Sequence, residues 1–187
     1  LAQVAHRQQR LAGLSPTITR CGVHSTHLTK WPGSTSLSGG MARAALAALR
    51  DHGLAEGLVV ARNEATGRAV AEGYGWAWVP SLATARPQVL LNATPVGMTP
   101  APGVADHSQR LPVDEDVVCR AEAVIDVVAY PAETPLVRLA REHGIPVITG
   151  AEIIALQAAA QFELYTGVRP SDEQVQRMKA ERRNIRP

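Results

Sequence analysis

The sequence has few aromatic residues and no long apolar run. Aromatic side chains make up 4% of the 187 residues, with a single phenylalanine, while the apolar fraction is 45%. This balance, in which alanine, valine and leucine dominate, favours helices packed on a sheet over an aromatic-rich β-sandwich. No apolar run approaches the roughly 20 residues that a membrane-spanning helix needs. The sequence therefore predicts a soluble globular protein without a membrane partner.

Cysteine and acidic residues are also scarce in places where they would be informative. The two cysteines, Cys21 and Cys119, lie far apart and lack the spacing of a metal site. We therefore expect reduced thiols, a cytoplasmic location and no bound metal. No acidic residue precedes Asp51, yet the formal net charge of the chain is only +2. This charge predicts no nucleic-acid partner.

Residues 1–35 differ in character from the rest of the chain. They are basic, rich in serine and threonine, and show no lasting periodicity. We expect an irregular N-terminal segment; an organelle transit peptide is the less favoured alternative, because the amphipathic pattern is poor. Cys21, His24 and His27 resemble a metal cluster only superficially, since a fourth ligand is missing. Solvated loop side chains are the favoured interpretation.

Strand and helix patterns alternate from residue 36 onward. Their spacing predicts an α/β fold, a Rossmann-like doubly wound parallel sheet with C-terminal helices. We assign residues 36–150 to a nucleotide-binding domain and 151–187 to helices that pack toward a substrate cleft. Residues 99–117, rich in proline, predict a surface loop. Helices are expected at 38–50, 65–72, 134–143, 151–166 and 171–183, and strands at 57–61, 89–92, 123–129 and 145–148, with a third strand or an irregular edge at 74–79.

The helix at 38–50 opens with the pair Gly39-Gly40. A glycine pair exposes backbone N–H groups beside the positive end of the helix dipole, which suits a pyrophosphate. The dinucleotide fingerprint is incomplete, because Leu37 or Ser38 stands where another glycine is expected. A plain strand-to-helix turn is the alternative interpretation.

Arg62 points to the identity of the nucleotide. It follows the second strand, about twenty residues beyond the glycines, where an NAD-binding domain places an acidic residue for the ribose hydroxyls. An arginine there suits a 2′-phosphate through a charge-assisted contact. The pattern favours NADP over NAD, and the alternative is a solvated arginine at a strand end.

A second candidate stretch runs from an apolar strand into a polar turn at residues 89–98. Asn92 and Thr94 offer compact polar groups, Pro95 fixes the backbone, and Gly97 permits a tight bend or a close approach. Ligands bind just past the carboxyl ends of strands in open α/β sheets. The stretch therefore predicts part of a cofactor site, or a well-made turn.

Several stretches together resemble the shikimate dehydrogenase family over about residues 38–180. They are SGGMARA at 38–44, NATPVGM at 92–98, DVV at 126–128 with ETP at 133–135, and GAEIIALQ at 150–157 leading into QFELYTG at 161–167. The motif GGMARA at 39–44, together with ARN at 61–63 and VAYP at 128–131, resembles the shikimate dehydrogenase-like branch of the family.

The resemblance implies an NADP-dependent hydride transfer between shikimate, or a related quinate-like cyclic hydroxy acid, and its 3-dehydro form, within aromatic amino-acid biosynthesis. It also implies roles for individual residues. Ser38, Gly39, Gly40 and Met41 would hold the pyrophosphate, Arg62 and Asn63 the adenosine phosphate, Asn92 and Thr94 would lie along the cofactor, Gly150 near the nicotinamide, and Gln157 would bind a substrate hydroxyl. Without the resemblance, Gln157 is a helix surface amide.

Three departures from the family pattern stand out. Leu37 replaces the first glycine of the turn, and Ala129-Tyr130 replaces a Tyr-Asn pair. Family members also carry a substrate domain upstream, with a catalytic Lys and Asp, and neither motif is found; the surroundings of Lys30 do not match. We therefore assign no catalytic residue, and a non-catalytic nucleotide-binding module is the second hypothesis. Under either hypothesis we expect exposed apolar surface and self-association, for example as a homodimer.

Overall fold

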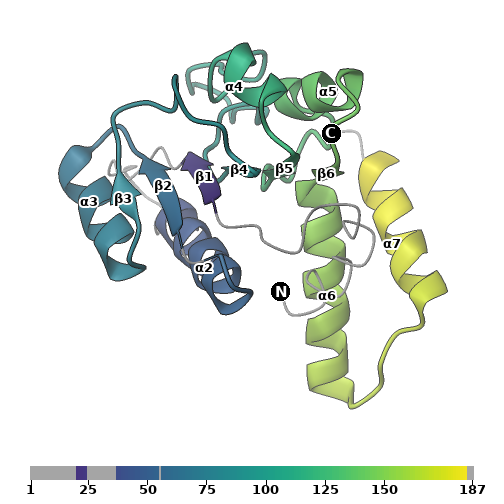
Figure 1. Cartoon of the computed structure of the whole chain (residues 1–187). Helices are drawn as coiled ribbons and strands as arrows, with labels where there is room; N and C mark the ends of the chain where they lie inside the picture. Colours follow the sequence, from purple (N-terminus) through teal and green to yellow (C-terminus); the bar gives the residue numbers. More distant parts are fainter. Residues whose placement is uncertain (1–19, 25–36, 55, 185–187) are drawn as a thin grey trace.

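The computed structural model describes residues 20–24, 37–54 and 56–184. They form one sheet of six parallel strands in the order β3-β2-β1-β4-β5-β6 (Figure 1). This is the strand order of a doubly wound Rossmann sheet, so the expected fold class is confirmed. The strands are β1 (Arg20–His24), β2 (Glu56–Val60), β3 (Ala77–Trp78), β4 (Val89–Asn92), β5 (Ala123–Asp126) and β6 (Val147–Ile148).

The strand β1 lies at the centre of this sheet. Its Gly22 is paired with Leu58 of β2 on one side and with Leu90 of β4 on the other. The expectation that residues 1–35 stay irregular is therefore wrong for Arg20–His24, and the domain boundary at residue 36 is too late. The strand carries charged or polar residues at both ends and a central glycine, so it has no apolar run to predict it. The other residues of the 1–35 segment lie outside the described part.

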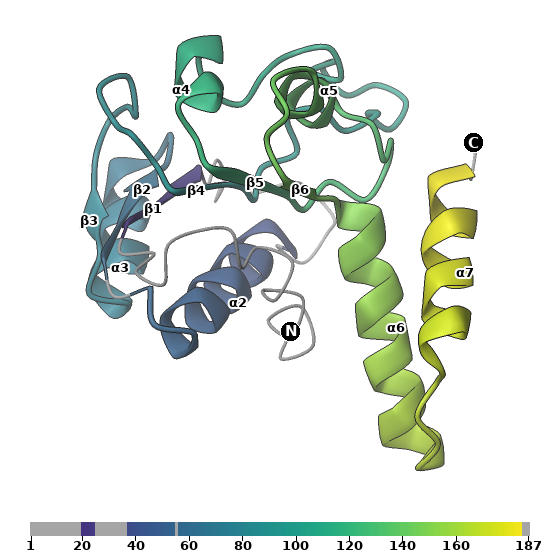
Figure 2. The same cartoon turned by 45° about the vertical axis from the view of Figure 1, so that its right-hand side comes forward.

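Helices cover both faces of the sheet. The helices α2 and α3 lie on one face, and α4 and α5 lie on the other (Figure 2). The helix α6 leaves the sheet at β6, and α7 packs along α6. The six helices of the described residues are α2 (Leu37–Asp51), α3 (Glu64–Gly73), α4 (Glu115–Cys119), α5 (Pro135–Glu142), α6 (Gly150–Thr166) and α7 (Asp172–Asn184).

The core is divided between the two faces because successive strand residues point in opposite directions. Val59 and Leu91 pack toward α2 and α3, whereas their neighbours Val60 and Leu90 pack toward α4 and α5. Burial of each such side chain contributes about 1.5–3 kcal/mol. Alternation of this kind on buried parallel strands explains why these strands read as continuous apolar runs.

Local signals set the ends of the helices as expected. The Thr134 hydroxyl accepts a hydrogen bond from Val137 N at 3.1 Å, and Pro135 is the first residue of α5. Gly144, just past the end of α5, has φ +68°, and Gly53, past α2, has φ +88°. Ser171 caps α7 by accepting from Gln174 N at 3.2 Å. These caps confirm the predicted helix ends.

One helix was not expected. The segment 99–117 was predicted as a surface loop, but α4 begins at Glu115 and buries Val117 and Val118 against the sheet. A helix of five residues is too short to show a helical period in the sequence, so only its burial distinguishes it from a loop. None of the helices in the described ranges is both long enough and apolar enough to cross a membrane.

Candidate functional site

The predicted site residues gather at the carboxyl edge of the sheet. Val60, His24, Asn92 and Asp126 are register partners on four neighbouring strands, so they mark one line along this edge. Arg62 and Asn63 follow β2 just beyond this line, and Thr94 follows β4. Gly150, two residues after the end of β6, extends the same edge. The clustering expected from the doubly wound topology is present.

Asn92, at the end of β4, is fully buried and uses its whole amide group inside the protein. Its Nδ2 donates to Asp126 Oδ1 at 3.0 Å and to Val96 O at 3.3 Å. Its Oδ1 accepts from Thr94 N at 3.0 Å and from Thr94 Oγ1 at 2.7 Å. An amide has two donor hydrogens and two acceptor lone pairs, so Asn92 has reached its capacity.

Thr94 is likewise 3% exposed, and its hydroxyl accepts from Val96 N at 3.0 Å. The side chains of Asn92 and Thr94 therefore fold the loop after β4 rather than present free polar groups at the surface. Direct contact of these two residues with a cofactor stays a prediction, and it would involve the backbone of this loop or a rearranged side chain.

Asp126, at the end of β5, joins this loop to α5. Its Oδ1 accepts from Val128 N at 3.1 Å, and its Oδ2 accepts from Thr134 Oγ1 at 2.6 Å. Burial raises the pKa of the Asp126 carboxyl, while the hydrogen bonds from Thr134, Val128 and Asn92 act in the opposite direction and offset part of the rise. Together, Asn92, Thr94, Asp126 and Thr134 form one buried polar network.

Two glycines let the backbone segments of the edge approach one another. Gly97 has φ +91°, and a β-carbon there would lie 3.1 Å from the Cβ of Thr134. A β-carbon on Gly150 would lie 2.1 Å from the carbonyl oxygen of Val128, which is backbone and has little room to move. The start of α6 therefore packs directly on the loop after β5, and only glycine fits there.

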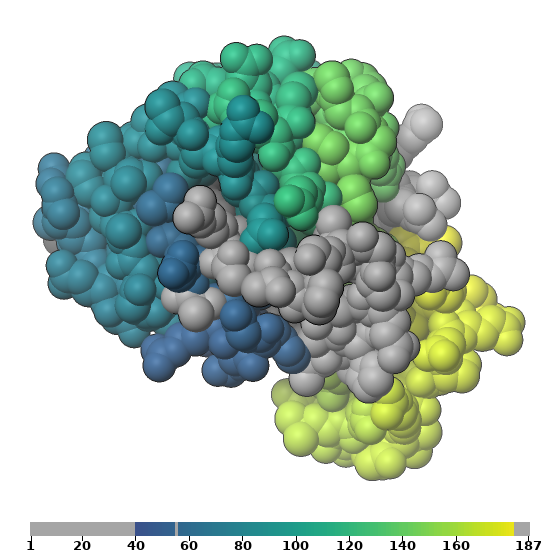
Figure 3. All heavy atoms as spheres, viewed as in Figure 1, coloured from purple at the N-terminus to yellow at the C-terminus, as the bar shows by residue number. Residues whose placement is uncertain are grey.

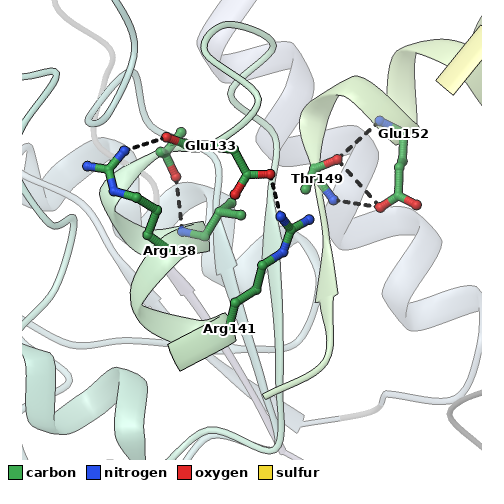
Figure 4. Close-up of polar contacts among 7 residues, drawn as sticks. Glu133, Arg138, Arg141, Thr149 and Glu152 are labelled. Carbon is green, nitrogen blue, oxygen red and sulfur yellow. Dashed lines mark hydrogen bonds and ion pairs between the residues drawn. The ribbon is translucent and has the colours of Figure 1, made fainter. Parts of the chain in front are cut away.

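The starts of α5 and α6 are further held by polar contacts (Figure 4). Thr149 and Glu152 form a capping box, with Glu152 N donating to Thr149 Oγ1 at 3.3 Å and Thr149 N donating to Glu152 Oε2 at 3.2 Å. Before α5, Glu133 pairs with Arg141, and its carbonyl oxygen accepts from Arg138 Nη1 at 2.7 Å. The capping box orients the helix that carries Gly150 and Gln157.

One end of this edge lies where β2 leads into α3. Arg62 is exposed there, and the exposed Asn63 caps α3 by accepting from Thr66 N at 2.9 Å. A helix start next to an arginine combines two positive sources for an anion. Ser38, Gly39, Gly40 and Met41 lie at the start of α2, and their contact with a pyrophosphate stays a prediction. A β-carbon on Gly40 would meet nothing within 4 Å, so the surface there is open.

Gln157 lies on α6, seven residues after Gly150, which places it about 10 Å along the helix. It is half-buried, so its side chain is neither a core residue nor a fully solvated amide. Its substrate role stays a prediction.

Comparison with known proteins identifies the group to which this architecture belongs. No protein-family model matches the chain. The shikimate dehydrogenase-like protein of Haemophilus influenzae is 42% identical over 136 residues, which are 73% of this chain and 49% of that protein. The shikimate dehydrogenase (NADP(+)) of Archaeoglobus fulgidus is 35% identical over 153 residues, which are 76% of this chain and 54% of that protein. Over its matched length, the chain belongs to the shikimate dehydrogenase family.

Solved structures of the shikimate dehydrogenase family agree with this assignment. A shikimate 5-dehydrogenase-like protein superposes with a TM-score of 0.76 at 34% identity, covering 95% of this chain and 60% of that one. The Thermus thermophilus shikimate 5-dehydrogenase, solved in complex with NADP(H) and shikimate, gives a TM-score of 0.70 at 27% identity, covering 97% and 61%. The resemblance inferred from motifs is confirmed. The chain spans about half the length of the curated relatives it matches.

Sequence reasoning missed the joint role of Asp126 and Thr134 in this member of the shikimate dehydrogenase family. Both residues appeared only as parts of a motif and a helix cap, whereas the structure shows them bonded to each other and to the loop after β4. The available signal was an acidic residue that ends an apolar strand. Such a carboxyl group needs buried partners, and Thr134 stands eight residues later.

The family's upstream lysine has no counterpart among the residues that the structure describes. The sequence contains two lysines. Lys30 lies outside the described residues, and Lys179 is buried on α7, which packs against α6. Ala129, in place of the family's tyrosine, is exposed, and the neighbouring Tyr130 is half-buried. No catalytic residue is assigned among the residues that the structure describes.

Proposed function

We propose that this chain is the cofactor-binding half of a shikimate dehydrogenase-like oxidoreductase, which transfers hydride between NADP and shikimate or a related quinate-like hydroxy acid. One observation carries the proposal: Arg62, the start of α2 and the network around Asp126 all occupy the carboxyl edge of a doubly wound sheet. Ligands of such sheets bind at this edge. The relatives named as NADP-dependent enzymes support the choice of cofactor.

The residues of the chain divide the work of cofactor binding. The start of α2 offers backbone N–H groups and a positive dipole end to the pyrophosphate. Arg62 binds the 2′-phosphate, with Asn63 beside it at the start of α3. Gly150 lets the start of α6 pack directly on the loop after β5, and these two backbone segments line the nicotinamide end of the cofactor. The Asp126 network holds the loops after β4 and β5 in place.

Gln157 donates a hydrogen bond to a substrate hydroxyl. Oxidation of an alcohol also requires a base on its O–H group. We assign that base to no residue of this chain and place it in the part of the relatives' length that the chain does not span. The proposed location is the cytoplasm, which the exposed free thiol of Cys119 supports. The proposed assembly is a homodimer, which the exposed apolar side chains at the end of α6 support.

The alternative is a nucleotide-binding module without catalysis. It is supported by the lack of an assigned base in the described residues. Shikimate-dependent reduction of NADP⁺, followed together with NADPH binding, separates the two. Turnover supports the enzyme, whereas NADPH binding without turnover supports the module. A chain that binds neither NADPH nor NADH contradicts both.

Replacement of Arg62 tests the cofactor assignment directly. Arg62→Ala should weaken NADPH binding by about 1.5–3 kcal/mol, the scale of a hydrogen bond to a charged group, and leave NADH binding nearly unchanged. Fluorescence titration with both cofactors measures this. Arg177→Ala, an exposed arginine on α7, serves as the matched control and should change neither affinity. Equal losses for the two cofactors would exclude the 2′-phosphate role.

A further inference from the structure

Three side chains with metal-ligating atoms meet on the surface where α4 packs beside α5. They are Glu115, Cys119 and His143, and one ligand atom of each lies within 4.8 Å of those of the other two. All three residues are exposed. Sequence analysis expected no metal site because the two cysteines are far apart, and this cluster needs only one of them.

Local structure and packing bring the three residues together. Glu115 and Cys119 are four residues apart in α4, so they share one face of the helix. His143 is the C-cap of α5. The two helices lie side by side on one face of the sheet (Figures 1 and 2), and Val118 of α4 shares a core cluster with Ala140 of α5. The three candidate ligands therefore project from two helices whose buried sides pack in the same core cluster.

The electrostatic surroundings favour a cation. The carbonyl end of α5 points toward His143, and the negative end of a helix dipole attracts positive charge. The two nearest arginines in sequence have partners elsewhere. Arg120 donates to Ala83 O at 2.7 Å and to Ala85 O at 3.2 Å, and Arg141 pairs with Glu133.

The ligand set selects the metal. A thiolate, an imidazole and a carboxylate form a mixed S, N, O set that suits Zn²⁺, with water as the fourth ligand on the exposed side. Metal–ligand bonds of about 2.0–2.3 Å place tetrahedral ligand atoms about 3.3–3.6 Å apart. The three ligand atoms lie within 4.8 Å of one another, so metal binding requires the exposed side chains to rotate and bring these atoms closer together.

We propose that Glu115, Cys119 and His143 bind a Zn²⁺ ion that links α4 to the end of α5. The site is separate from the proposed cofactor edge, because His143 follows the last turn of α5 whereas Thr134 of the buried network precedes its first turn. A metal ion that binds the folded state but not the unfolded state stabilises the folded state. Saturating Zn²⁺ should therefore raise the temperature of unfolding.

The test uses the full 187-residue chain after treatment with a chelator. We expect one Zn²⁺ per chain in a competition titration with a chromophoric chelator. Co²⁺ should give the thiolate-to-cobalt charge-transfer absorption that reports a Cys ligand. Loss of partners outside the first coordination sphere already costs 10–100-fold in metal affinity. Cys119→Ser and His143→Gln should therefore each lower the affinity at least about tenfold, and Glu115→Gln should lower it less.

The chain offers a matched control in Asp51 and His52, two exposed side chains with metal-ligating atoms at the end of α2. The double variant D51N/H52Q should keep the affinity and the cobalt absorption of the original chain. Binding that survives Cys119→Ser or His143→Gln overturns the proposal, as does binding that the double variant loses. An absence of stoichiometric binding in the original chain overturns it as well. Thermal unfolding of the metal-free variants should match the original chain, because the three side chains are exposed.

Discussion

The carboxyl edge of the sheet buries polar side chains, whereas the outer end of α6 exposes apolar ones. At the ends of β4 and β5, polar Asn92 and Asp126 are fully buried, and partners within the protein satisfy their groups. At the outer end of α6, apolar Leu164 and Tyr165 are 79% and 81% exposed. In Figure 3 the yellow-green atoms of α6 lie at the lower edge of the molecule.

The difference shows which of the two regions is held by contacts within this chain. A buried polar network is stable only when its members have partners, so the edge around Asp126 is held by contacts within the chain. Exposed apolar side chains that lie together are typical of surfaces that bind another molecule. The network around Asp126 therefore needs no further partner, whereas we propose that the outer end of α6 contacts another polypeptide. The predictions below test this contrast.

The largest effect is expected from Asp126→Ala. This change removes the acceptor of Asn92 Nδ2, Val128 N and Thr134 Oγ1, and each buried donor left without a partner costs about 1–3 kcal/mol. We expect a loss of at least about 3 kcal/mol in the free energy of unfolding, measured by urea denaturation. Glu122→Ala, an exposed acidic residue close in sequence, should change it by less than about 0.5 kcal/mol. Similar values for the two variants would contradict the role of the network.

Gly97→Ala should have an intermediate effect. The residue has φ +91°, and an added β-carbon would meet Thr134 at 3.1 Å. Backbone strain of this kind costs about 1–3 kcal/mol. Gly73→Ala is the control, because its β-carbon would meet nothing within 4 Å and its φ is not positive. Thermal unfolding of both variants checks the prediction, which fails if Gly97→Ala is as stable as the original chain.

The pH dependence of stability should report the burial of Asp126. Burial raises the pKa of the Asp126 carboxyl in the folded chain above its ordinary value of 3.8, so the folded state binds the proton more tightly than the unfolded state does. This contribution to stability is complete below the unfolded pKa and is lost as the pH rises through the folded pKa. The stability of the original chain relative to Asp126→Asn should therefore fall as the pH increases across this window. Denaturation at a series of pH values measures it, and a flat difference would refute it.

The smallest effect on stability is expected at the outer end of α6. The double variant L164S/Y165S replaces two exposed side chains. Each replacement should change the free energy of unfolding by no more than about 0.5 kcal/mol. Self-association should weaken, because apolar surface is removed from the patch. Sedimentation velocity over a range of concentrations measures this. A large loss of stability would show that these side chains belong to the core.

The contrast between the two regions also bears on what could be predicted. Apolar runs and capping residues predicted most of the helices and strands. The strand β4 and the caps at Thr134 and Gly144 lie where they were expected. The places of Arg62 and Gly150 at the carboxyl edge followed from the alternation of strands and helices. Their binding roles stay predictions.

Short-range signals failed where long-range contacts decide. β1 has no apolar run in the sequence, and only its pairing with β2 and β4 in the structure identifies it as a strand. α4 is too short to show a period, and burial on the sheet defines it. The full occupation of the Asn92 amide was equally hidden, because one of its partners, Asp126, lies 34 residues away in the sequence.

The sequence by itself determined the fold class, the helix caps and the family, because propensity, capping and motif wording depend on residues a few positions apart. The tertiary structure decided which strand lies at the centre, which carboxyl group is buried, and which three surface side chains come within reach of one metal ion. These outcomes depend on contacts between segments far apart in the chain, and their energies come from burial and from hydrogen-bond partners that only the folded chain supplies.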